Sequence, residues 1–414
     1  MLLAATLVAA AVDIPVGAAA SQTYVVTDLG TLGGDTSASA INNAGWVVGT
    51  SVKFPPVSRR VDLAFLYRDG AMAGLGTVAG RFGEVFFWSS GATAINDAGD
   101  VVGSSDAPAG PYAPSSPEHH AFLYRGRRMI DLGTLGTDSV ATGLNDAGDV
   151  VGYYRVAGDV THAFLHRGGT MHDIGTLGGA SSRATAVNAD GVVVGFANFD
   201  AGFASHVFRY AGGVMTDLGT LGGDFGEPRA INRYGQIVGH ARLSESFDEH
   251  AFLYDDGVMH DLGSLAGPPY ASGADDINAA GQVVGSSSAA TGEPGGFVTH
   301  GFLYSDGVMV DLNTLVPAGS PVFYGATAIN DAGQIVATGL VKTIFSTPSY
   351  RAYLLTPMCG NGQVDAGETC DDGVQNGTAS CCTTGCMLAP EGTRCDGGRC
   401  GQAGTCQRLS LIHI

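Results

Sequence analysis

Three short phrases recur in a fixed order along most of this chain, each of them seven times. The first is typified by DLGTLGG, which starts at Asp28, the second by INxAGxVVG and the third by HAFLY. A repeat of about 40–50 residues is typical of a propeller, a solenoid or an array of small domains. The asparagines of the second phrase, which mark the repeat, are Asn42, Asn96, Asn145, Asn188, Asn232, Asn278 and Asn330.

Each repeat contains four short runs that we interpret as β-strands. The runs AFLY and VMxDL are separated by a short D-G or G-G turn, which is the pattern of a β-hairpin. The runs ATAIN and VVG are joined by N-x-x-G, in which the asparagine can bond the turn backbone and the glycine accepts a positive φ. Four short strands at this period correspond to one blade of a propeller.

The two ends of the repeat region distinguish a ring from an open array. The first run, TYVVTDLG, is the second strand of the AFLY/VMxDL hairpin, and the last run, RAYLLTP, is its first strand. These strands can pair only if the ends meet, and their pairing would remove an exposed sheet edge. We therefore predict an all-β chain, with a seven-bladed β-propeller closed by the N- and C-terminal strands of the repeat region. An open β-solenoid is the alternative, although its repeats are usually shorter.

A histidine opens five of the seven HAFLY phrases. An enzyme needs a catalytic base once, so a histidine that recurs in most repeats favours a structural role, bonded to a backbone or aspartate partner. A catalytic or metal-binding role is the alternative. The histidines are His120, His162, His206, His250 and His300, while Leu63 and Arg351 replace the histidine in the first and last copies.

The phrases resemble the HAF repeats of secreted bacterial proteins, which are named after the His-Ala-Phe triplet. The triplet is present here at His120–Phe122, His162–Phe164 and His250–Phe252. The resemblance covers residues 24–355 and implies an extracellular repeat protein. It implies no particular activity.

Composition and cysteine placement restrict the class of partner and the location. The formal net charge is −19, so the chain lacks the basic stripe with which proteins bind nucleic acids. Residues 1–20 are small and apolar and end in Ala18-Ala19-Ala20, which fits an export signal, with a short buried helix as the alternative. No later stretch is long and apolar enough to be a transmembrane segment. We expect an extracellular protein, either secreted or at the cell surface.

All eight cysteines lie in residues 358–408, which we predict to be a small disulfide-rich module. The patterns CGNGxVxxGExCD, from Cys359, and CCxxxCxLxxxGxxC, from Cys381, resemble disintegrin-like modules of secreted metalloproteases. They resemble the Cys-rich repeats of bacterial surface proteins more closely, because Asp372 replaces a cysteine of the metalloprotease modules. Integrin binding is therefore not implied. The cysteines, whose pairing the sequence leaves open, are Cys359, Cys370, Cys381, Cys382, Cys386, Cys395, Cys400 and Cys406.

The same resemblance implies a structural calcium ion in this module. Its oxygen ligands would come from Asn361, Asp365, Glu368 and Asp371, with the carbonyl of Gln363 as a further ligand. The chemistry agrees independently, because calcium takes about six to eight oxygens from carboxylates, amides and carbonyls. A solvated acidic turn is the alternative.

The expected organisation is an export signal at 1–20, the propeller at 21–357 and the Cys-rich module at 358–408. Residues 409–414, LSLIHI, match the translation of a transposon end used in sequencing libraries. We expect this hexapeptide to be an artefact and the module to be truncated by it.

Alternate connections of a blade emerge on the same face, so the short D-G and N-x-x-G turns share one face. The longer GTLGG connections and the links from VVG to HAFLY share the other, which we call the variable-loop face. Loops on a rigid scaffold commonly carry binding sites. We predict ligand binding there by Arg81, Glu84, Phe87 and Trp88, a mixture suited to stacking on a sugar or docking a protein. An extra strand packed on the ring is the alternative for these aromatic residues.

These features predict a binding or adhesion protein whose partner is an extracellular protein or glycan. The alternative is a glycan-active hydrolase or lyase on the variable-loop face, because Glu84 in RFGEV is echoed by Glu227 in DFGEP. Paired carboxylates about 5–9 Å apart suit glycoside hydrolysis. The sequence contains no nucleophile motif, phosphate-binding loop or histidine cluster at metal-ligand spacing, so a binding role is favoured.

Removal of calcium should lower the melting temperature of the Cys-rich module in the oxidised protein. A ligand present at 100 times its Kd stabilises the folded state by about 2.7 kcal/mol. Asp371→Ala should abolish this response in calorimetric scans with calcium and with a chelator. Identical scans of the unaltered protein under both conditions would exclude the site.

Overall fold

The computed structural model describes residues 23–54, 60–78, 88–107, 118–199, 204–244, 248–291, 293, 296–341 and 349–358, and the backbone of three later strands. Tyr24–Pro357 forms one compact unit. The later strands, β29 (Arg394–Cys395), β30 (Gly398–Cys400) and β31 (Cys406–Arg408), form a three-stranded antiparallel sheet in chain order. The proposed calcium ligands and five of the eight cysteines lie outside the described residues, so the calcium site and the disulfides stay predictions.

The described residues of the unit Tyr24–Pro357 form seven four-stranded antiparallel groups, which we call blades, and one short 3-10 helix, η1 (Leu312–Thr314). Blade 1 is β2 (Thr36–Ile41), β3 (Val47–Lys53), β4 (Val61–Arg68) and β5 (Ala71–Gly74). Blade 2 is β6 (Ser90–Ile95), β7 (Val101–Ala107), β8 (Glu118–Arg125) and β9 (Arg128–Asp131). Blade 3 is β10 (Ser139–Leu144), β11 (Val150–Ala157), β12 (Val160–Arg167) and β13 (Thr170–Asp173). Blade 4 is β14 (Ser182–Val187), β15 (Val193–Asn198), β16 (Ser205–Ala211) and β17 (Val214–Gly219). Blade 5 is β18 (Gly222–Ile231), β19 (Ile237–Leu243), β20 (Glu249–Asp255) and β21 (Val258–Asp261). Blade 6 is β22 (Ser272–Ile277), β23 (Val283–Ala290), β24 (Phe297–Ser305) and β25 (Val308–Asp311). Blade 7 is β26 (Phe323–Ile329), β27 (Ile335–Val341), β28 (Ser349–Pro357) and β1 (Tyr24–Asp28).

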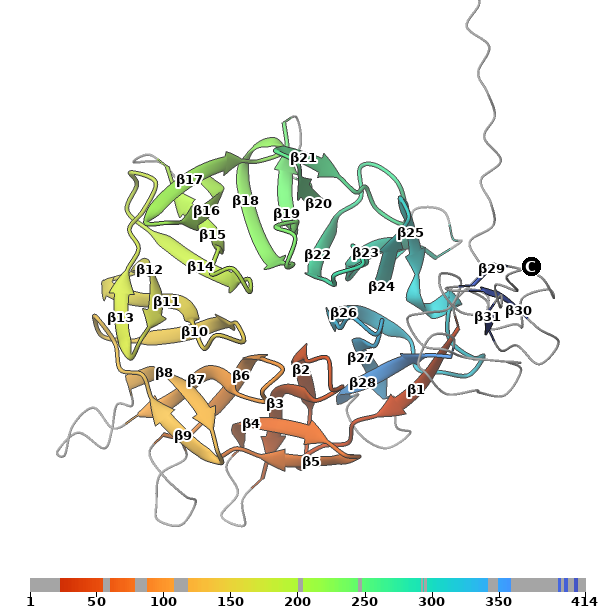
Figure 1. Ribbon diagram of the computed structural model, residues 1–414, viewed down its shortest axis with the longest axis horizontal. Helices are drawn as coiled ribbons and strands as arrows, with labels where there is room; N and C mark the ends of the chain where they lie inside the picture. Colours follow the sequence, from red (N-terminus) through yellow and green to blue (C-terminus); the bar gives the residue numbers. More distant parts are fainter. Residues whose placement is uncertain are drawn as a thin grey trace, which may run out of the picture. The chain divides into compact units, whose positions relative to one another are not determined.

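The blades are arranged around a common centre in a propeller-like ring, with the first strand of each blade innermost (Figure 1). Blades 4 and 5 are additionally linked by a single parallel bridge between Ser205 and Phe225. The fold is therefore all-β, as the four strand-like runs of each repeat predict.

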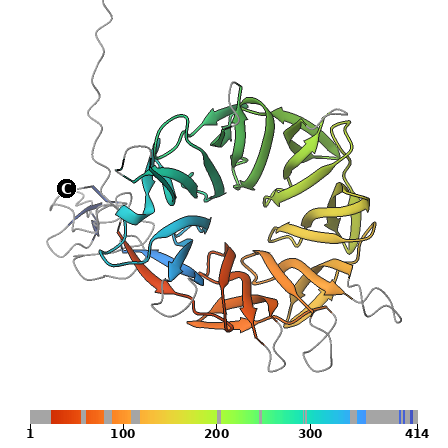
Figure 2. The ribbon, with the colours of Figure 1, turned by 180° about the vertical axis from the view of Figure 1, so that it is seen from behind.

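The first and last strands of the unit pair with each other in blade 7. Strand β1 runs antiparallel to β28 from Tyr24 opposite Pro357 to Asp28 opposite Tyr353. Both views of the ring show the two strands side by side (Figures 1 and 2). The predicted pairing of the two ends is thus confirmed, and β28 gains a partner on the edge that it would otherwise expose.

A hydrophobic cluster fills each joint between neighbouring blades. At the joint of blades 1 and 2, Val48 and Leu66 pack with Ile95, Val101 and Phe122. Full burial of one such side chain contributes about 1.5–3 kcal/mol. Because each blade is buried on both faces, its strands are apolar on both faces and show no clean alternation.

The joint between blade 7 and blade 1 contains a cluster of the same kind. Phe65 and Ile41 of blade 1 pack there with Val336 and Leu354 of blade 7. The hydroxyl of Thr327 also donates to the carbonyl of Ala38 at 3.0 Å. The last blade therefore contacts the first through the same chemistry that joins consecutive blades.

The asparagines of the N-x-x-G turns form a ring of hydrogen bonds around the centre. Each Nδ2 donates to the backbone carbonyl of the next blade's asparagine at 3.0–3.4 Å, and Asn330 donates to Asn42 at 3.1 Å, which closes the ring. All seven asparagines are buried. Each Oδ1 accepts from the backbone of its own turn, as at Asn42, which bonds the amides of Ala44 and Trp46. Gly45 completes that turn at φ +75°, a conformation that favours glycine.

Replacement of a ring donor should destabilise the whole unit. Asn330→Asp keeps the acceptor of the turn but removes the donor to the carbonyl of Asn42 and to Oε1 of Gln334. A buried carbonyl left without a partner costs about 1–3 kcal/mol, and this loss should appear in the free energy of unfolding by denaturant. Asn198→Asp is the matched control, because Asn198 donates to a backbone carbonyl outside the ring and should cost less. Equal losses in the two variants would contradict a special role for the ring.

Candidate functional site

The repeated histidines are bound to repeated aspartates at the outer part of the blades. Each Nδ1 lies 2.7–2.9 Å from an aspartate carboxylate at or near the end of the following strand, as for His250 and Asp261. The same aspartate accepts a backbone N–H from two residues further on, for example from Gly263 at 2.8 Å. The histidine thus fixes the hairpin and the loop that follows it. The predicted aspartate partner of these histidines is confirmed.

The two copies without histidine support this conclusion. In blade 1, Leu63 faces Gly74, so both the imidazole and its carboxylate are replaced by apolar groups. In blade 7, Arg351 takes the place of histidine and its Nη1 lies 3.5 Å from Asp28 on the paired strand β1. The aspartate is therefore kept where a cation, His or Arg, faces it and is lost where Leu63 does, as expected for a structural contact.

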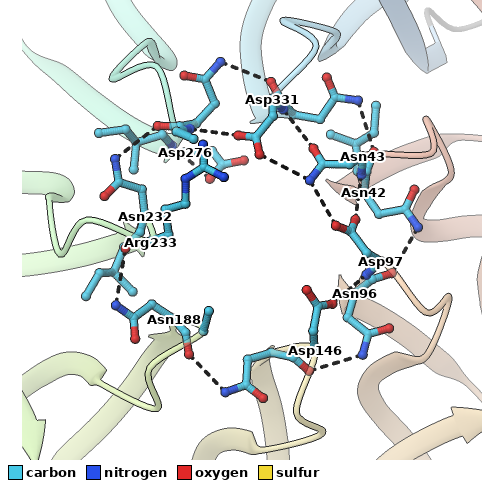
Figure 3. A pocket seen from close by; sticks show the side chains of 18 of the residues that line it. Asn42, Asn43, Asn96, Asp97, Asp146, Asn188, Asn232, Arg233, Asp276 and Asp331 are labelled. Atoms are coloured by element: carbon cyan, nitrogen blue, oxygen red, sulfur yellow. Dashed lines mark hydrogen bonds between the residues drawn. The ribbon is translucent and has the colours of Figure 1, made fainter.

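A central pocket of about 260 Å³ opens at the middle of the ring, on the face of the short turns. Figure 3 shows the asparagine ring around it and the charged side chains that project toward its middle. Three carboxylates come from the residue after the ring asparagine, namely Asp97, Asp146 and Asp331, and Arg233 is the cation from the same position. Each of the three carboxylates also accepts a backbone N–H from the preceding blade, at 2.8–2.9 Å. The mouth is therefore acidic, and its carboxylates also act as joints between blades.

Asp276 is the fourth carboxylate of the central pocket and departs from the repeat. Alanine or glycine occupies this position in the other six blades, next to the register shift of the innermost strand. Its Oδ2 accepts from the amide of Ile329 in blade 7 at 2.9 Å. Burial, reinforced by the charges of Asp275 and Asp331, raises the pKa of Asp276 to about 7. Burial also raises the pKa of Asp275 to about 6.

A second cavity, which we call the rim pocket, lies on the variable-loop face between blades 2, 3 and 4. Its volume is about 160 Å³. Its lining comes from the ends of β7 and β11 and the beginnings of β8, β10, β12 and β14, and these strand ends meet on that face. The lining residues are Ser104, His119, Asp138, Ser139, Val140, Tyr153, Arg155, Thr161 and Arg183.

The guanidinium of Arg183 lies over the ring of Tyr153, 4.5 Å from its centre. Its Nε donates to the hydroxyl of Thr161 at 3.2 Å. Arg155, by contrast, is engaged by Asp138, at 3.3 Å, and by the exposed Asp159. His119 holds Asp106 through Nδ1 at 2.9 Å. Each charged group of the pocket is thus held in place by at least one neighbour.

Both members of the stacked pair depart from the repeat. The strand pairing places Tyr153 where the other blades have threonine, serine, phenylalanine or histidine. Arg183 stands where they have serine, valine, glutamate or, in three blades, glycine. A residue that the scaffold does not require at six equivalent places is a candidate for a local function.

Of the four ligand-binding residues predicted from the sequence, Trp88 alone is described. It is half-buried and lies just before β6, and Arg81, Glu84 and Phe87 lie outside the described residues. Glu227, the proposed partner of Glu84, forms an ion pair with Arg229 at 3.1 Å. The described residues thus do not test the aromatic cluster or the pair of carboxylates.

The sequence reasoning missed both pockets. The rim pocket had a detectable signal, because an alignment of the seven repeats shows that Arg183 and Tyr153 occur in one copy each. The central pocket was hidden by its regularity, since the residues after the ring asparagines look like ordinary turn residues. Only the ring arrangement of the blades shows that these turns converge on one point.

No family model and no curated protein matches this chain. Among solved structures, the chain has a TM-score of 0.38 and 13% identity with TolB from Acinetobacter baumannii, covering 75% of this chain and 63% of TolB. The values for an acylaminoacyl peptidase from Pyrococcus horikoshii are 0.43 and 9%, covering 77% of this chain and 51% of the peptidase. A neuraminidase-like protein of subtype N11 from a flat-faced bat influenza A virus gives 0.37 and 10%, with 84% and 96% covered. The chain therefore spans about half to two thirds of the first two proteins, and no property of the three is transferred to it.

The described residues lack two kinds of feature. They contain no helix long and apolar enough to cross a membrane. They also contain no group of three or more histidine, cysteine, aspartate or glutamate side chains arranged to hold a metal ion.

The raised pKa of Asp276 predicts a pH-dependent stability. Because the folded protein holds this proton more tightly than the unfolded chain does, Asp276 increasingly disfavours folding as the pH rises from about 4 to about 7. Asp276→Ala, which introduces the residue common in the other blades, removes this contribution. The melting temperature of the variant relative to the unaltered protein should therefore rise between pH 5 and pH 8. A difference that stays constant with pH would contradict the assignment.

Proposed function

We propose that this chain is a secreted or surface-attached binding protein. In this proposal, residues 21–357 are a seven-bladed β-propeller closed by its terminal strands, and the variable-loop face binds an extracellular ligand. The disulfide-rich module that follows would carry a structural calcium ion. The extracellular assignment is supported by the apolar N-terminus, the clustered cysteines and the resemblance to HAF-repeat proteins.

One observation supports the binding role: repeated side chains hold the blades together, whereas non-repeated side chains line a cavity. The repeated asparagines, histidines and aspartates are engaged in bonds within and between blades. The side chains that differ between blades, Tyr153 and Arg183, line a cavity on the variable-loop face. A rigid scaffold with local variation at the loop-bearing end is the arrangement by which repeat proteins bind ligands.

The contacts of the candidate catalytic groups favour binding over hydrolysis. Glu227 is paired with Arg229, so its carboxylate already has a charged partner. The carboxylates of the central pocket accept backbone N–H groups of the preceding blade. These groups therefore already have structural partners.

A screen of the full chain against arrays of glycans and extracellular proteins should identify a ligand. The double variant Tyr153→Thr/Arg183→Ser, which introduces the residues of blade 1 at these places, should lose that ligand and keep its melting temperature. Asp146→Ala, in the central pocket on the opposite face, is the control and should retain it. Loss of the ligand in the control alone, or its retention in the double variant, would contradict the assignment of the binding face.

A further inference from the structure

The rim pocket contains a positively charged group with no carboxylate partner among the described residues. Arg183 is held by Tyr153 and Thr161, and these contacts use the face of the guanidinium and its Nε. Its two terminal nitrogens make no described hydrogen bond. Several other described arginines also lack an acidic partner, but among them Arg183 alone lines the rim pocket.

The contacts of Arg183 also fix its orientation. The stacked tyrosine ring and the bond from Nε to Thr161 hold the guanidinium plane, so little side-chain entropy remains to be lost on binding. A guanidinium held in this way presents its remaining N–H groups as a fork, the geometry that matches a carboxylate or a sulfate. Arg183 is therefore prepared for an anionic group rather than for a neutral one.

The rest of the cavity is polar. The hydroxyls of Ser104 and Thr161 and the Nε2 of His119 have hydrogen-bonding capacity that the described contacts do not use. Val140 is the one aliphatic side chain of the lining. A ligand with several hydroxyl groups satisfies such a lining, whereas an apolar ligand would leave its polar groups without partners.

We propose that the rim pocket binds an acidic sugar, with its carboxylate or sulfate on Arg183 and its hydroxyls on Thr161, Ser104 and His119. This inference rests on the proposed binding function and names the class of ligand. Tyr153 positions the guanidinium and does not stack on the sugar with the face that Arg183 covers.

Titration calorimetry on the full chain tests the proposal with D-glucuronate, D-glucose 6-sulfate and D-glucose as probes. At least one acidic probe should bind about tenfold or more tightly than glucose, because hydrogen bonds to charged groups are the stronger ones. The methyl ester of glucuronate should bind like glucose if the carboxylate is recognised. Preference for one acidic probe then distinguishes carboxylate from sulfate.

Variants test the residue assignment. Arg183→Gln should remove the preference for the acidic probe, and Arg183→Lys should keep part of it. Arg68→Gln is the matched control, because Arg68 also lies over an aromatic ring, that of Trp46, at 5.4 Å, but does not line the rim pocket. It should bind as the unaltered protein does. Melting temperatures show whether each variant is folded, and the ester comparison holds even if Arg183→Gln is not.

Glucose binding as tightly as both acidic sugars would overturn the proposal, and so would an unchanged preference in folded Arg183→Gln. Absence of binding by all sugar probes would also reject the acidic-sugar assignment. In that case, a ligand from the array that the double variant loses would leave the proposed binding function standing.

Discussion

The closed ring of seven asparagine hydrogen bonds is the constraint on which the rest of this structure depends. Each side chain caps its own turn through Oδ1 and joins the next blade through Nδ2, so one residue fixes both the local and the long-range geometry. The hydrogen bond from Asn330 to Asn42 joins residues 288 apart in the sequence. Its donor–acceptor distance, 3.1 Å, equals that of the bond from Asn278 to Asn330. Because a blade exposes two apolar faces when it stands alone, its stability depends on this closure and on the hydrophobic clusters beside it.

The ring also determines where charged and polar side chains can gather. Its bonds bring the residues that follow the asparagines to a single point, which creates the acidic central pocket. On the opposite face the blades differ in sequence, and there Tyr153 and Arg183 differ from the residues at the same positions of other blades. The scaffold therefore uses identical residues for assembly and variable ones at the site of the proposed recognition.

Much of the fold could be predicted from the sequence, because the repeat is regular and its ends are complementary. The pairing of β1 with β28 followed from an unpaired half-hairpin at each end, and the role of His250 followed from its recurrence. The donation of Asn42 to the next blade could not be predicted, since the turn alone explains that asparagine. The raised pKa of Asp276 was equally hidden, because it depends on burial and on charges from Asp275 and Asp331 that meet only in the folded ring.

Hydrogen exchange of the asparagine side-chain amides tests the closed ring most directly. With asparagine labelled selectively and each signal assigned by substitution, the Nδ2 protons of Asn330 should exchange as slowly as those of Asn145, through global unfolding alone. Equal protection would show that the joint between the last and first blades is as strong as an internal joint. Fast exchange at Asn330, beside slow exchange at Asn145, would show that the ring opens at its termini and would contradict the account.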